Sequence, residues 1–475
     1  MKTKNLLTIA IALLFAITSL SAKTKIACVG NSITFGYGIA ERMENSYPAQ
    51  LQRSLGDEYE VQNYGVNGAT ILSNGNNPFI KKDNYKKSLE FNPDIVIIKL
   101  GTNDSKSPNM EHFADFEQNY IDFINSYKAL ESSPRIILVT PVICYRDVEE
   151  AIYDPRIVKQ IIPAIENVAY ATGVEIIDGH SLFSQTLDKE IFPDLLHPSA
   201  KGAASMVETF TRHLLADRDE EYSLLDKMEG GKEFNYHGYK GCSYTIGGTE
   251  VKIVEPKVAN ARHSWIQRAR FWGNNPKLEV RLLELGFHLV YCDCTHEFGS
   301  EEAMKKWDTL FKIVTKRGLN KKMVVEGYSR GGLFVYNWVT KYPKRVSALY
   351  ADAPVLDPMS WPLGSGTSKG SEEMTENILK AYGLSSREEM ASYKGTPMKN
   401  AEKIAKSGVP LIHVIGTADE LVPVAENTAP FAEAIRKSGG KIEIIEKEGI
   451  GHHPHSLDVP EPLVQFILKA EGLMK

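Results

Sequence analysis

Short apolar runs rich in β-branched residues alternate with stretches of helical periodicity through the first part of the chain, from residue 25 to about 216. The apolar runs predict buried strands, and the amphipathic stretches 113–130 and 156–171 predict helices between them. The predicted strands are 25–30, 61–66, 94–100, 135–139 and 174–178. This alternation indicates a parallel sheet with helices on both faces.

A similar alternation resumes in the second half, without repeating the first half's sequence. Helical periodicity is strongest at 301–317 and 332–342. The predicted strands are 251–254, 288–291, 323–326, 346–351, 411–415 and 441–445. We expect a second, mostly parallel sheet, so that the chain holds two α/β domains.

A charged, turn-rich passage separates the two halves. Residues 217–221 read Asp-Arg-Asp-Glu-Glu, and residues 228–232 read Met-Glu-Gly-Gly-Lys, with no apolar period strong enough for a core element. We therefore place the domains at 23–221 and 222–475.

The first 22 residues have the layout of a secretory signal peptide. Lys2 and Lys4 precede an apolar run over residues 6–20, and the small residues Ser21 and Ala22 follow it. The run is short for a transmembrane helix, and no cysteine follows it where a lipid could attach. We expect cleavage near Ala22 and a periplasmic or secreted protein without a membrane anchor.

Composition narrows the class of partner. The 475 residues are 43% hydrophobic and 24% charged, with a formal net charge of −5. This balance is ordinary for a soluble globular protein and shows none of the basic excess that nucleic-acid binding favours. The five cysteines are too few and too irregularly spaced for a disulfide framework, so we expect buried thiols.

Four motifs of the first half follow predicted strands and hold groups suited to acyl transfer. They are Gly30-Asn31-Ser32, Gly68, Gly101-Thr102-Asn103-Asp104 and Asp194-Leu195-Leu196-His197. In parallel sheets the carboxyl ends of strands share one edge, where ligands bind. A serine hydroxyl becomes a good nucleophile when an imidazole takes its proton, and fixed N–H donors stabilise the oxyanion that forms. Any one of these residues is commonplace; the ordered set indicates a serine esterase.

In order and content these motifs resemble those of the SGNH, or GDSL-type, hydrolases, although that family often has Asp where this chain has Asn31. The resemblance implies a three-layer α/β/α sandwich over the first half. It also implies Ser32 as nucleophile, His197 as general base and Asp194 as the group that orients the imidazole. The oxyanion donors would be the amides of Ser32 and Gly68 and the side chain of Asn103.

The second half contains Gly327-Tyr328-Ser329-Arg330-Gly331 directly after a predicted strand. This spacing is typical of the sharp strand-to-helix turn that presents a nucleophilic serine, and an acid and a histidine follow in chain order. From about residue 244 onward, the pattern resembles the α/β-hydrolase fold and implies Ser329, Asp419 and His452 as its triad. His453 and His455 remain alternatives for the base, and Asp352 for the acid.

The oxyanion donors of the second half are less well determined. The backbone N–H of Arg330 is one expected donor, and the loop after residues 251–254 is expected to supply the other. The Ser329-Arg330 pair also resembles glucuronoyl esterases, where the arginine contacts the substrate oxyanion. An alternative is that Arg330 begins a helix and pairs with a carboxylate.

The five tryptophans all lie in the second half. Trp265 and Trp361 are predicted to lie in loops that flank the second site, where they are candidates for stacking on sugar rings, whereas we expect Trp307 and Trp338 to pack in the core.

Together these features predict an exported bifunctional serine esterase that removes acyl groups, acetyl above all, from glycans such as xylan or pectin. The alternatives are a sialate O-acetylesterase, a general esterase or lipase, and one active domain fused to a glycan-binding domain, with peptidase action by the second half as a minor option. We expect no cofactor and no metal, and assign His452, His453 and His455 to catalysis and packing. The oligomeric state stays open.

Overall fold

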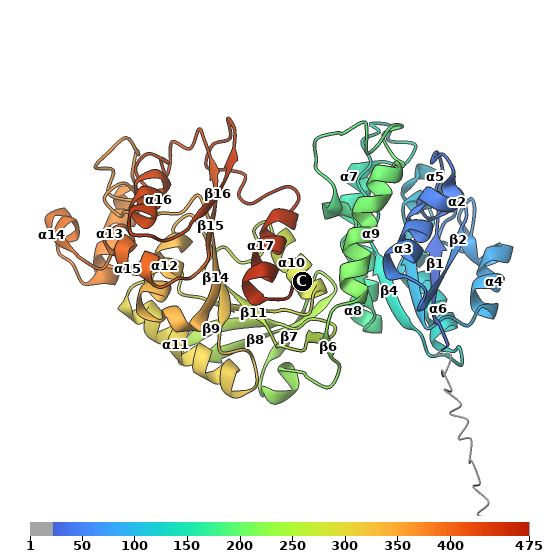
Figure 1. Ribbon diagram of the computed structural model, residues 1–475, viewed down its shortest axis with the longest axis horizontal. Coiled ribbons are helices and arrows are strands. Elements are labelled where there is room, and N and C mark those ends of the chain that lie inside the picture. The colour runs from blue at the N-terminus through green and yellow to red at the C-terminus, as the bar shows by residue number, and fades with distance from the viewer. Residues whose placement is uncertain (1–21, 475) are drawn as a thin grey trace, which may run out of the picture.

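The computed structural model describes residues 22–474, which form two α/β bodies side by side (Figure 1). The predicted signal peptide thus falls almost wholly outside the described residues. The first body holds a five-stranded sheet in the order β2-β1-β3-β4-β5, with every neighbouring pair parallel. Its strands are β1 (Thr24–Gly30), β2 (Tyr59–Gly65), β3 (Ile95–Lys99), β4 (Arg135–Val139) and β5 (Glu175–Ile177). All five predicted strands are present.

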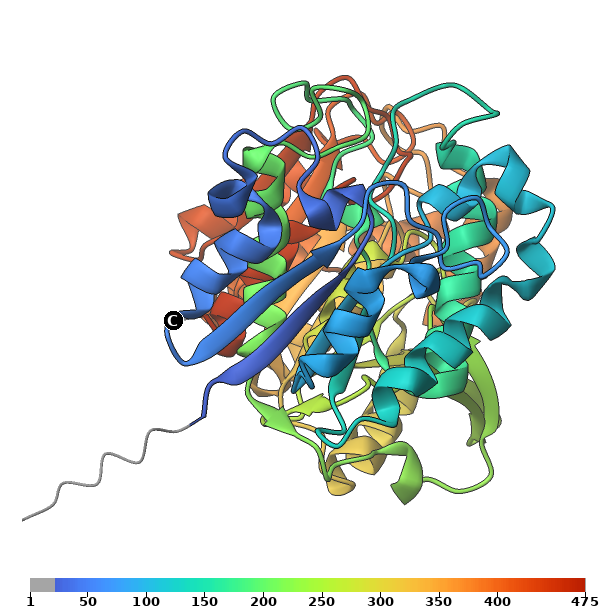
Figure 2. The same ribbon diagram turned by 90° about the vertical axis from the view of Figure 1, so that its right-hand side faces the viewer.

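Helices cover both faces of this first sheet. Because successive strand residues point to opposite faces, Ile26 and Cys28 of β1 pack in one cluster, and Ala27 and Val29 pack in another. The first cluster includes α3 (Tyr47–Leu55) and α9 (Ala200–Leu214), and the second includes α6 (Phe116–Lys128) and α8 (Ile162–Thr172). Figure 2 looks onto this domain, with its strands between the two helix layers. The predicted three-layer sandwich is confirmed.

The second body holds a nine-stranded sheet in the order β16-β15-β14-β13-β11-β12-β9-β8-β7. Six neighbouring strands are parallel: β11 (Trp265–Arg268), β12 (His288–Cys292), β13 (Met323–Tyr328), β14 (Val346–Asp352), β15 (Leu411–Gly416) and β16 (Glu443–Lys447). Three antiparallel strands extend it: β7 (Lys232–Tyr236), β8 (Tyr239–Ile246) and β9 (Thr249–Val254). The sheet is mostly parallel, as predicted, although the pattern did not identify β7, β8 or β11.

Helices also cover both faces of the second sheet. One face packs against α11 (Glu301–Lys316), α12 (Gly331–Lys341), α15 (Ala401–Lys406) and α16 (Thr428–Lys437). The other packs against α10 (Lys277–Glu284) and α17 (Glu461–Glu471). Between β14 and β15 the chain forms α13 (Glu372–Tyr382) and α14 (Arg387–Ser392), which surround a small apolar cluster of their own.

The two bodies share one apolar core. Ile176 of β5 belongs to the same buried cluster as Tyr239 of β8 and Val280 of α10. Hydrogen bonds cross the same boundary: the Tyr239 hydroxyl donates to the Ile176 carbonyl at 3.1 Å, and the Asp178 N–H donates to Glu284 Oε1 at 2.7 Å. The domains are therefore held as one unit rather than joined by a free linker.

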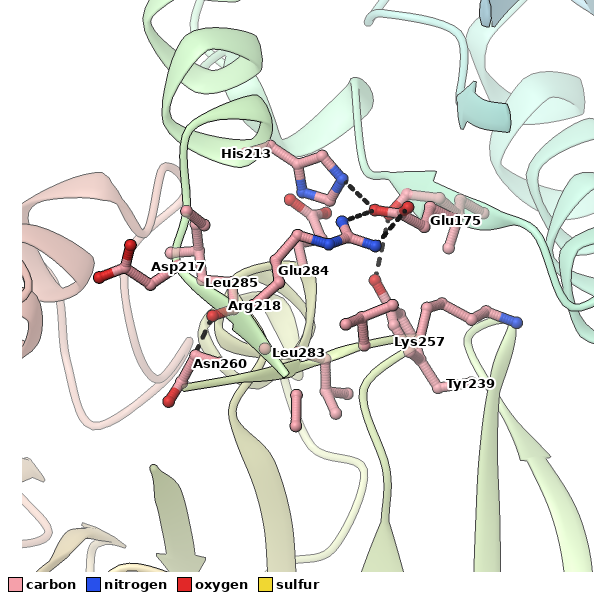
Figure 3. Close-up of a pocket in the computed structure, with 15 residues that line it drawn as sticks. Glu175, His213, Asp217, Arg218, Tyr239, Lys257, Asn260, Leu283, Glu284 and Leu285 are labelled. Atoms are coloured by element: carbon pink, nitrogen blue, oxygen red, sulfur yellow. Dashed lines mark hydrogen bonds and ion pairs between the residues drawn. The ribbon is translucent and has the colours of Figure 1, made fainter. Parts of the chain in front are cut away.

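A buried ion cluster anchors the segment between α9 and β7, within which the predicted domain boundary falls. Glu175 accepts hydrogen bonds from Arg135 Nε at 2.7 Å, His213 Nε2 at 2.7 Å and Arg218 Nη1 at 2.9 Å. Figure 3 shows the contacts of His213 and Arg218 with Glu175. Arg218 lies on the short strand β6 (Arg218–Asp219), which pairs with β10 (Ala259–Asn260) of the second domain. One carboxylate of the first domain thus fixes the connecting segment.

Two further expectations concern cysteines and membranes. All five cysteines are free and buried, as predicted, and the sulfur atoms of Cys292 and Cys294 lie 3.6 Å apart. Within residues 22–474, no helix has the length and apolar character needed to cross a bilayer.

Candidate active sites

Ser32 lies at the carboxyl end of β1, where the strand turns into the short helix α1 (Ser32–Phe35). The preceding Asn31 caps this helix, because its side-chain oxygen accepts the Ile33 N–H at 3.0 Å. Ser32 is 9% exposed, so its hydroxyl is shielded but reachable from the pocket that it lines.

The three predicted catalytic groups of the first domain meet in one hydrogen-bonded chain. Ser32 Oγ lies 2.9 Å from His197 Nε2, and His197 Nδ1 lies 2.7 Å from Asp194 Oδ2. The other oxygen of Asp194 accepts the backbone N–H of His197 at 2.7 Å. Burial raises the pKa of Asp194, but the hydrogen bonds from His197 outweigh it and the net pKa is lowered. An ionised Asp194 fixes Nδ1–H as donor, which leaves Nε2 to accept the serine proton.

The predicted oxyanion donors line the same pocket as the serine. Gly68 has a φ of +74°, a conformation that favours glycine, and the Asn103 side chain donates one N–H to the Ala69 carbonyl at 3.1 Å. An amide carries two N–H bonds, so this contact orients Asn103 and leaves a second donor. Buried Asp104 accepts the backbone N–H of Leu72 at 2.9 Å and ties the Gly68 loop to the Asn103 loop. Burial raises the pKa of Asp104 to about 6 against the backbone hydrogen bonds.

Three residues around this pocket were not identified from the sequence. Arg146 donates to Asp194 Oδ2 at 2.8 Å, and it lines the pocket together with Lys106. The ring of Tyr37, which is half exposed, lies 4.7 Å from the His197 ring. All three belong to loops without a motif, so their position beyond strand ends was the only available signal.

Ser329 occupies a sharp turn between β13 and α12. Its φ of +50° is left-handed, which is strained for a residue with a side chain. Gly327 permits this turn, because a Cβ there would lie 2.6 Å from the Gly331 carbonyl oxygen. The geometry is that of the nucleophile turn predicted from the spacing.

Asp419 and His452 complete a second hydrogen-bonded chain. His452 Nε2 lies 3.0 Å from Ser329 Oγ, and His452 Nδ1 lies 2.7 Å from Asp419 Oδ2. The other oxygen of Asp419 accepts the backbone N–H groups of Leu421 and Val422 at 2.9 and 2.8 Å. Among the alternatives left open, the structure therefore brings His452 and Asp419 to the serine.

The rival acid and the two other histidines are placed next to this chain. Buried His455 donates from Nδ1 to Asp352, which also accepts the Ser456 N–H at 2.8 Å. Asp352 is thus occupied by His455 rather than by His452. His453 is exposed, and its ring lies 4.9 Å from the His452 ring and 4.6 Å from the His455 ring.

The loop expected to supply the second oxyanion donor reaches the second site through its last residues. A Cβ on Gly331 would lie 3.5 Å from Ala269 Cβ and 3.9 Å from Arg270 Cβ. These residues directly follow the parallel strand β11, which the sequence did not reveal because Gln267 and Arg268 interrupt its apolar run. Which N–H group donates stays a prediction.

Arg330 points its guanidinium among aromatic rings. Its central carbon lies 5.5, 5.8 and 5.9 Å from the ring centres of Phe271, Phe298 and Trp361. Its hydrogen-bond partner is the Met374 sulfur rather than a carboxylate, so the expected alternative of a carboxylate pair does not hold. Burial, and then the charge of Arg270, lower the Arg330 pKa to about 10.

The tryptophan expectations had mixed outcomes. Trp265 is fully buried on β11 and donates its Nε1–H to the Asn320 carbonyl at 2.8 Å, so its predicted sugar contact was wrong. Trp361 is 8% exposed and lies beside Arg330. Trp307 and Trp338 pack in the core as predicted.

Comparison with known families matches each domain separately. Residues 28–204 match the GDSL-like Lipase/Acylhydrolase family, and residues 312–470 match the Prolyl oligopeptidase family.

Individual relatives cover parts of the chain. An acetylxylan esterase of Xylanibacter ruminicola is 39% identical over 201 residues, which make up 39% of this chain and 42% of that relative. A protein of Acinetobacter baumannii described as a lipase is 15% identical, with 54% of this chain and 99% of that chain covered and a TM-score of 0.36. A dipeptidyl aminopeptidase IV of Bacteroides ovatus is 13% identical, with 49% and 36% covered and a TM-score of 0.39.

Proposed function

We propose that this chain, which carries a GDSL-like acylhydrolase domain followed by a prolyl oligopeptidase-type α/β-hydrolase domain, is an exported esterase with two serine sites. The first site removes acetyl groups from acetylated xylan or a chemically similar glycan. The hydrogen-bonded chain from Ser32 through His197 to Asp194 carries this proposal. The acetylxylan esterase relative matches over this domain and supports the choice of substrate.

The geometry of the first site supports the following role for each group. Ser32 Oγ attacks the acetyl carbonyl carbon while its proton passes to His197 Nε2, and Asp194 stabilises the imidazolium. The amides of Ser32 and Gly68 and the side chain of Asn103 receive the oxyanion. As the tetrahedral intermediate collapses, His197 protonates the departing sugar oxygen, which leaves as a hydroxyl group. Water, activated by the same imidazole, releases acetate from the acetyl-serine.

The proposal is tested by acetate release from acetylated xylan, acetylated pectin and an O-acetylated sialoglycan, with a prolyl p-nitroanilide peptide as the peptidase arm. Wild type, Ser32→Ala, Ser329→Ala and the double variant are compared as full chains. We expect Ser32→Ala to lose acetate release from xylan while Ser329→Ala retains it. If neither the wild type nor any variant releases acetate from any of these glycans, the proposal of a glycan esterase is wrong.

The proposed oxyanion role of Asn103 makes a separate prediction. Asn103→Ala removes one fixed donor, so we expect kcat for acetate release to fall by about 10²–10³-fold. KM should change little, because this hydrogen bond strengthens as charge develops in the transition state. A rise in KM with unchanged kcat would assign Asn103 to substrate binding instead.

The cations at the mouth of the first site favour a second candidate, an esterase for acidic acetylated glycans such as sialosides. Arg146 already binds Asp194, whereas Lys106 lines the pocket and is not part of the hydrogen-bonded chain. A carboxylate on the sugar would find its countercharge there.

Lys106→Met tests this second candidate, because it keeps an unbranched side chain of similar length and removes the charge. For an acidic acetylated glycan we expect KM to rise by about 5–10-fold, as for the loss of one partly exposed charge contact. KM for neutral acetylated xylan should be unchanged. An equal effect on both substrates would show that Lys106 shapes the pocket rather than recognising an anion.

The second site, built on Ser329, is assigned by the same reasoning to ester cleavage on the same type of glycan. Arg330 lies in the sharp turn between β13 and α12, and its guanidinium is surrounded by aromatic rings. This guanidinium is therefore a candidate contact for the polar part of a substrate. One glycan that carries two kinds of ester would be held near both sites at raised local concentration. Export is part of the proposal and rests on the apolar run at residues 6–20.

A further inference from the structure

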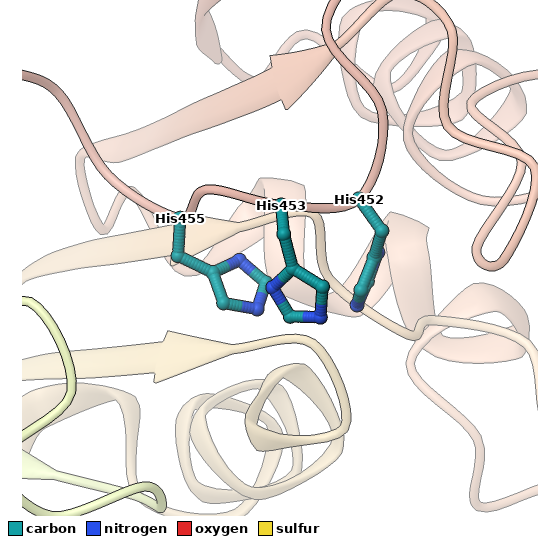
Figure 4. A group of neighbouring side chains, drawn as sticks. All are labelled: His452, His453 and His455. Atoms are coloured by element: carbon teal, nitrogen blue, oxygen red, sulfur yellow. The ribbon is translucent and has the colours of Figure 1, made fainter.

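Three histidines of one short loop after β16 face one another beside the second site. One ring nitrogen from each of His452, His453 and His455 lies within 4.8 Å of those of the other two. Figure 4 shows their rings converging, with centres 4.6 to 5.0 Å apart. Catalysis needs one of these imidazoles, so the chemistry of the triad does not account for the other two.

Two of the three imidazoles are oriented as metal ligands usually are. His452 donates from Nδ1 to Asp419, and His455 donates from Nδ1 to Asp352, and both carboxylate side chains are 1% exposed. Histidines that bind metals commonly donate their other ring nitrogen to a carboxylate, which fixes the tautomer and makes the free nitrogen more basic. Both rings therefore present Nε2 lone pairs.

We propose that His452, His453 and His455 bind one divalent transition-metal ion, with Zn²⁺ as the reference case, and that the bound ion blocks the Ser329 site. Three imidazoles with an open fourth position form a known type of zinc site. The fourth position falls to water or to Ser329 Oγ, because that hydroxyl already lies 3.0 Å from His452 Nε2. One lone pair on Nε2 cannot both hold a metal and take the serine proton.

The distances require a small closure of the cluster. Nitrogens at 2.0–2.1 Å from a tetrahedral ion lie roughly 3.3 Å apart, closer than the present limit of 4.8 Å. His453 supplies this movement, because it is exposed while the other two are buried and tethered to carboxylates.

Calorimetric titration of the metal-free full chain with Zn²⁺ tests binding without any assumption about activity. We expect one equivalent to bind, and His453→Ala to weaken binding by at least about tenfold. Asp352→Asn should also weaken it, by about 10–100-fold, because it removes the acceptor that orients His455. His112→Ala, at a partly buried histidine of the other domain, is the matched control and should bind like wild type.

The inhibitory part rests on the proposed function of the Ser329 site and is measured separately. In the Ser32→Ala background, Zn²⁺ should abolish the remaining p-nitrophenyl acetate turnover, and a chelator should restore it. With His453→Ala added, turnover without metal should persist and become insensitive to the same Zn²⁺ concentration.

Binding that is equal in wild type and His453→Ala, or absent in wild type, overturns the metal site. Tight binding with undiminished turnover overturns the inhibition alone. If the protein binds Zn²⁺ but its Ser329 site cleaves no ester, the proposed function of that site is wrong. The proposed metal site is unaffected by that result.

Discussion

Ser32→Ala is expected to lower kcat for acetate release from acetylated xylan by about 10⁴-fold or more, because serine hydrolases lose roughly that much without their nucleophile. In the wild type Ser32 Oγ lies 2.9 Å from His197 Nε2, and the variant lacks this hydroxyl. The oxyanion donors remain in the variant, so a small residual rate above the uncatalysed one should persist. Acetate release under saturating substrate measures the effect.

Ser105→Ala is the matched control for this variant. Ser105 is a buried serine of the Asn103 loop, and its hydroxyl donates to the Thr102 carbonyl at 2.8 Å instead of to an imidazole. Its removal should change kcat by less than an order of magnitude. Retention of xylan deacetylation by Ser32→Ala, together with its loss in Ser329→Ala, would move the activity to the second domain and refute the assignment.

Glu175→Gln is expected to lower the free energy of unfolding by about 3–5 kcal/mol, as the breaking of a buried ion pair does. The variant keeps its size but leaves Arg135, Arg218 and His213 around a neutral amide. Since Arg218 ties the connecting segment to the second domain, both domains should lose stability. Urea unfolding at neutral pH measures the difference, with Glu190→Gln as control. Glu190 pairs with Lys201 at the surface, where both side chains are more than half exposed, so its loss should cost less than about 1 kcal/mol.

The same substitution predicts a pH dependence. Burial raises the pKa of Glu175, but the hydrogen bonds and charges of His213 and Arg135 outweigh it and hold the pKa well below the usual range. A carboxyl with a depressed folded-state pKa contributes stability that is fully present above its unfolded pKa, about 4.3, and is lost as the pH falls towards the folded-state value. The wild type and Glu175→Gln should therefore converge in acid. A difference that stays constant down to low pH would point to packing instead.

The sequence was most informative where function requires short, rigid motifs at strand ends. Ser32, Asn103 and Ser329 each follow an apolar run directly, so parallel strand topology alone predicted that residues distant in the sequence would meet. Asp194 and His197 were accessible because they lie three positions apart in one motif.

The features that the sequence did not predict depend on contacts between segments whose sequences have no regular hydrophobic pattern. The strand β11 contains Gln267 and Arg268, whose side chains are buried although polar, and Arg268 pairs with Glu279 and Glu326 of other elements. Hydrophobic periodicity could therefore not reveal this strand. For the same reason Trp265 was taken for a loop residue. The pairing of Asp352 with His455 rather than with His452 is decided by tertiary packing, which separates three near-identical imidazoles.

The core shared by the two domains has a consequence for how such a protein can change over time. Tyr239 and Val280 of the second domain are buried in one apolar cluster with residues of the first domain. A duplication or exchange of either half with an unrelated partner would expose this apolar face and require several compensating substitutions at once. The halves are therefore expected to be inherited together and to diverge as a pair, even though each contains every group needed for its own chemistry.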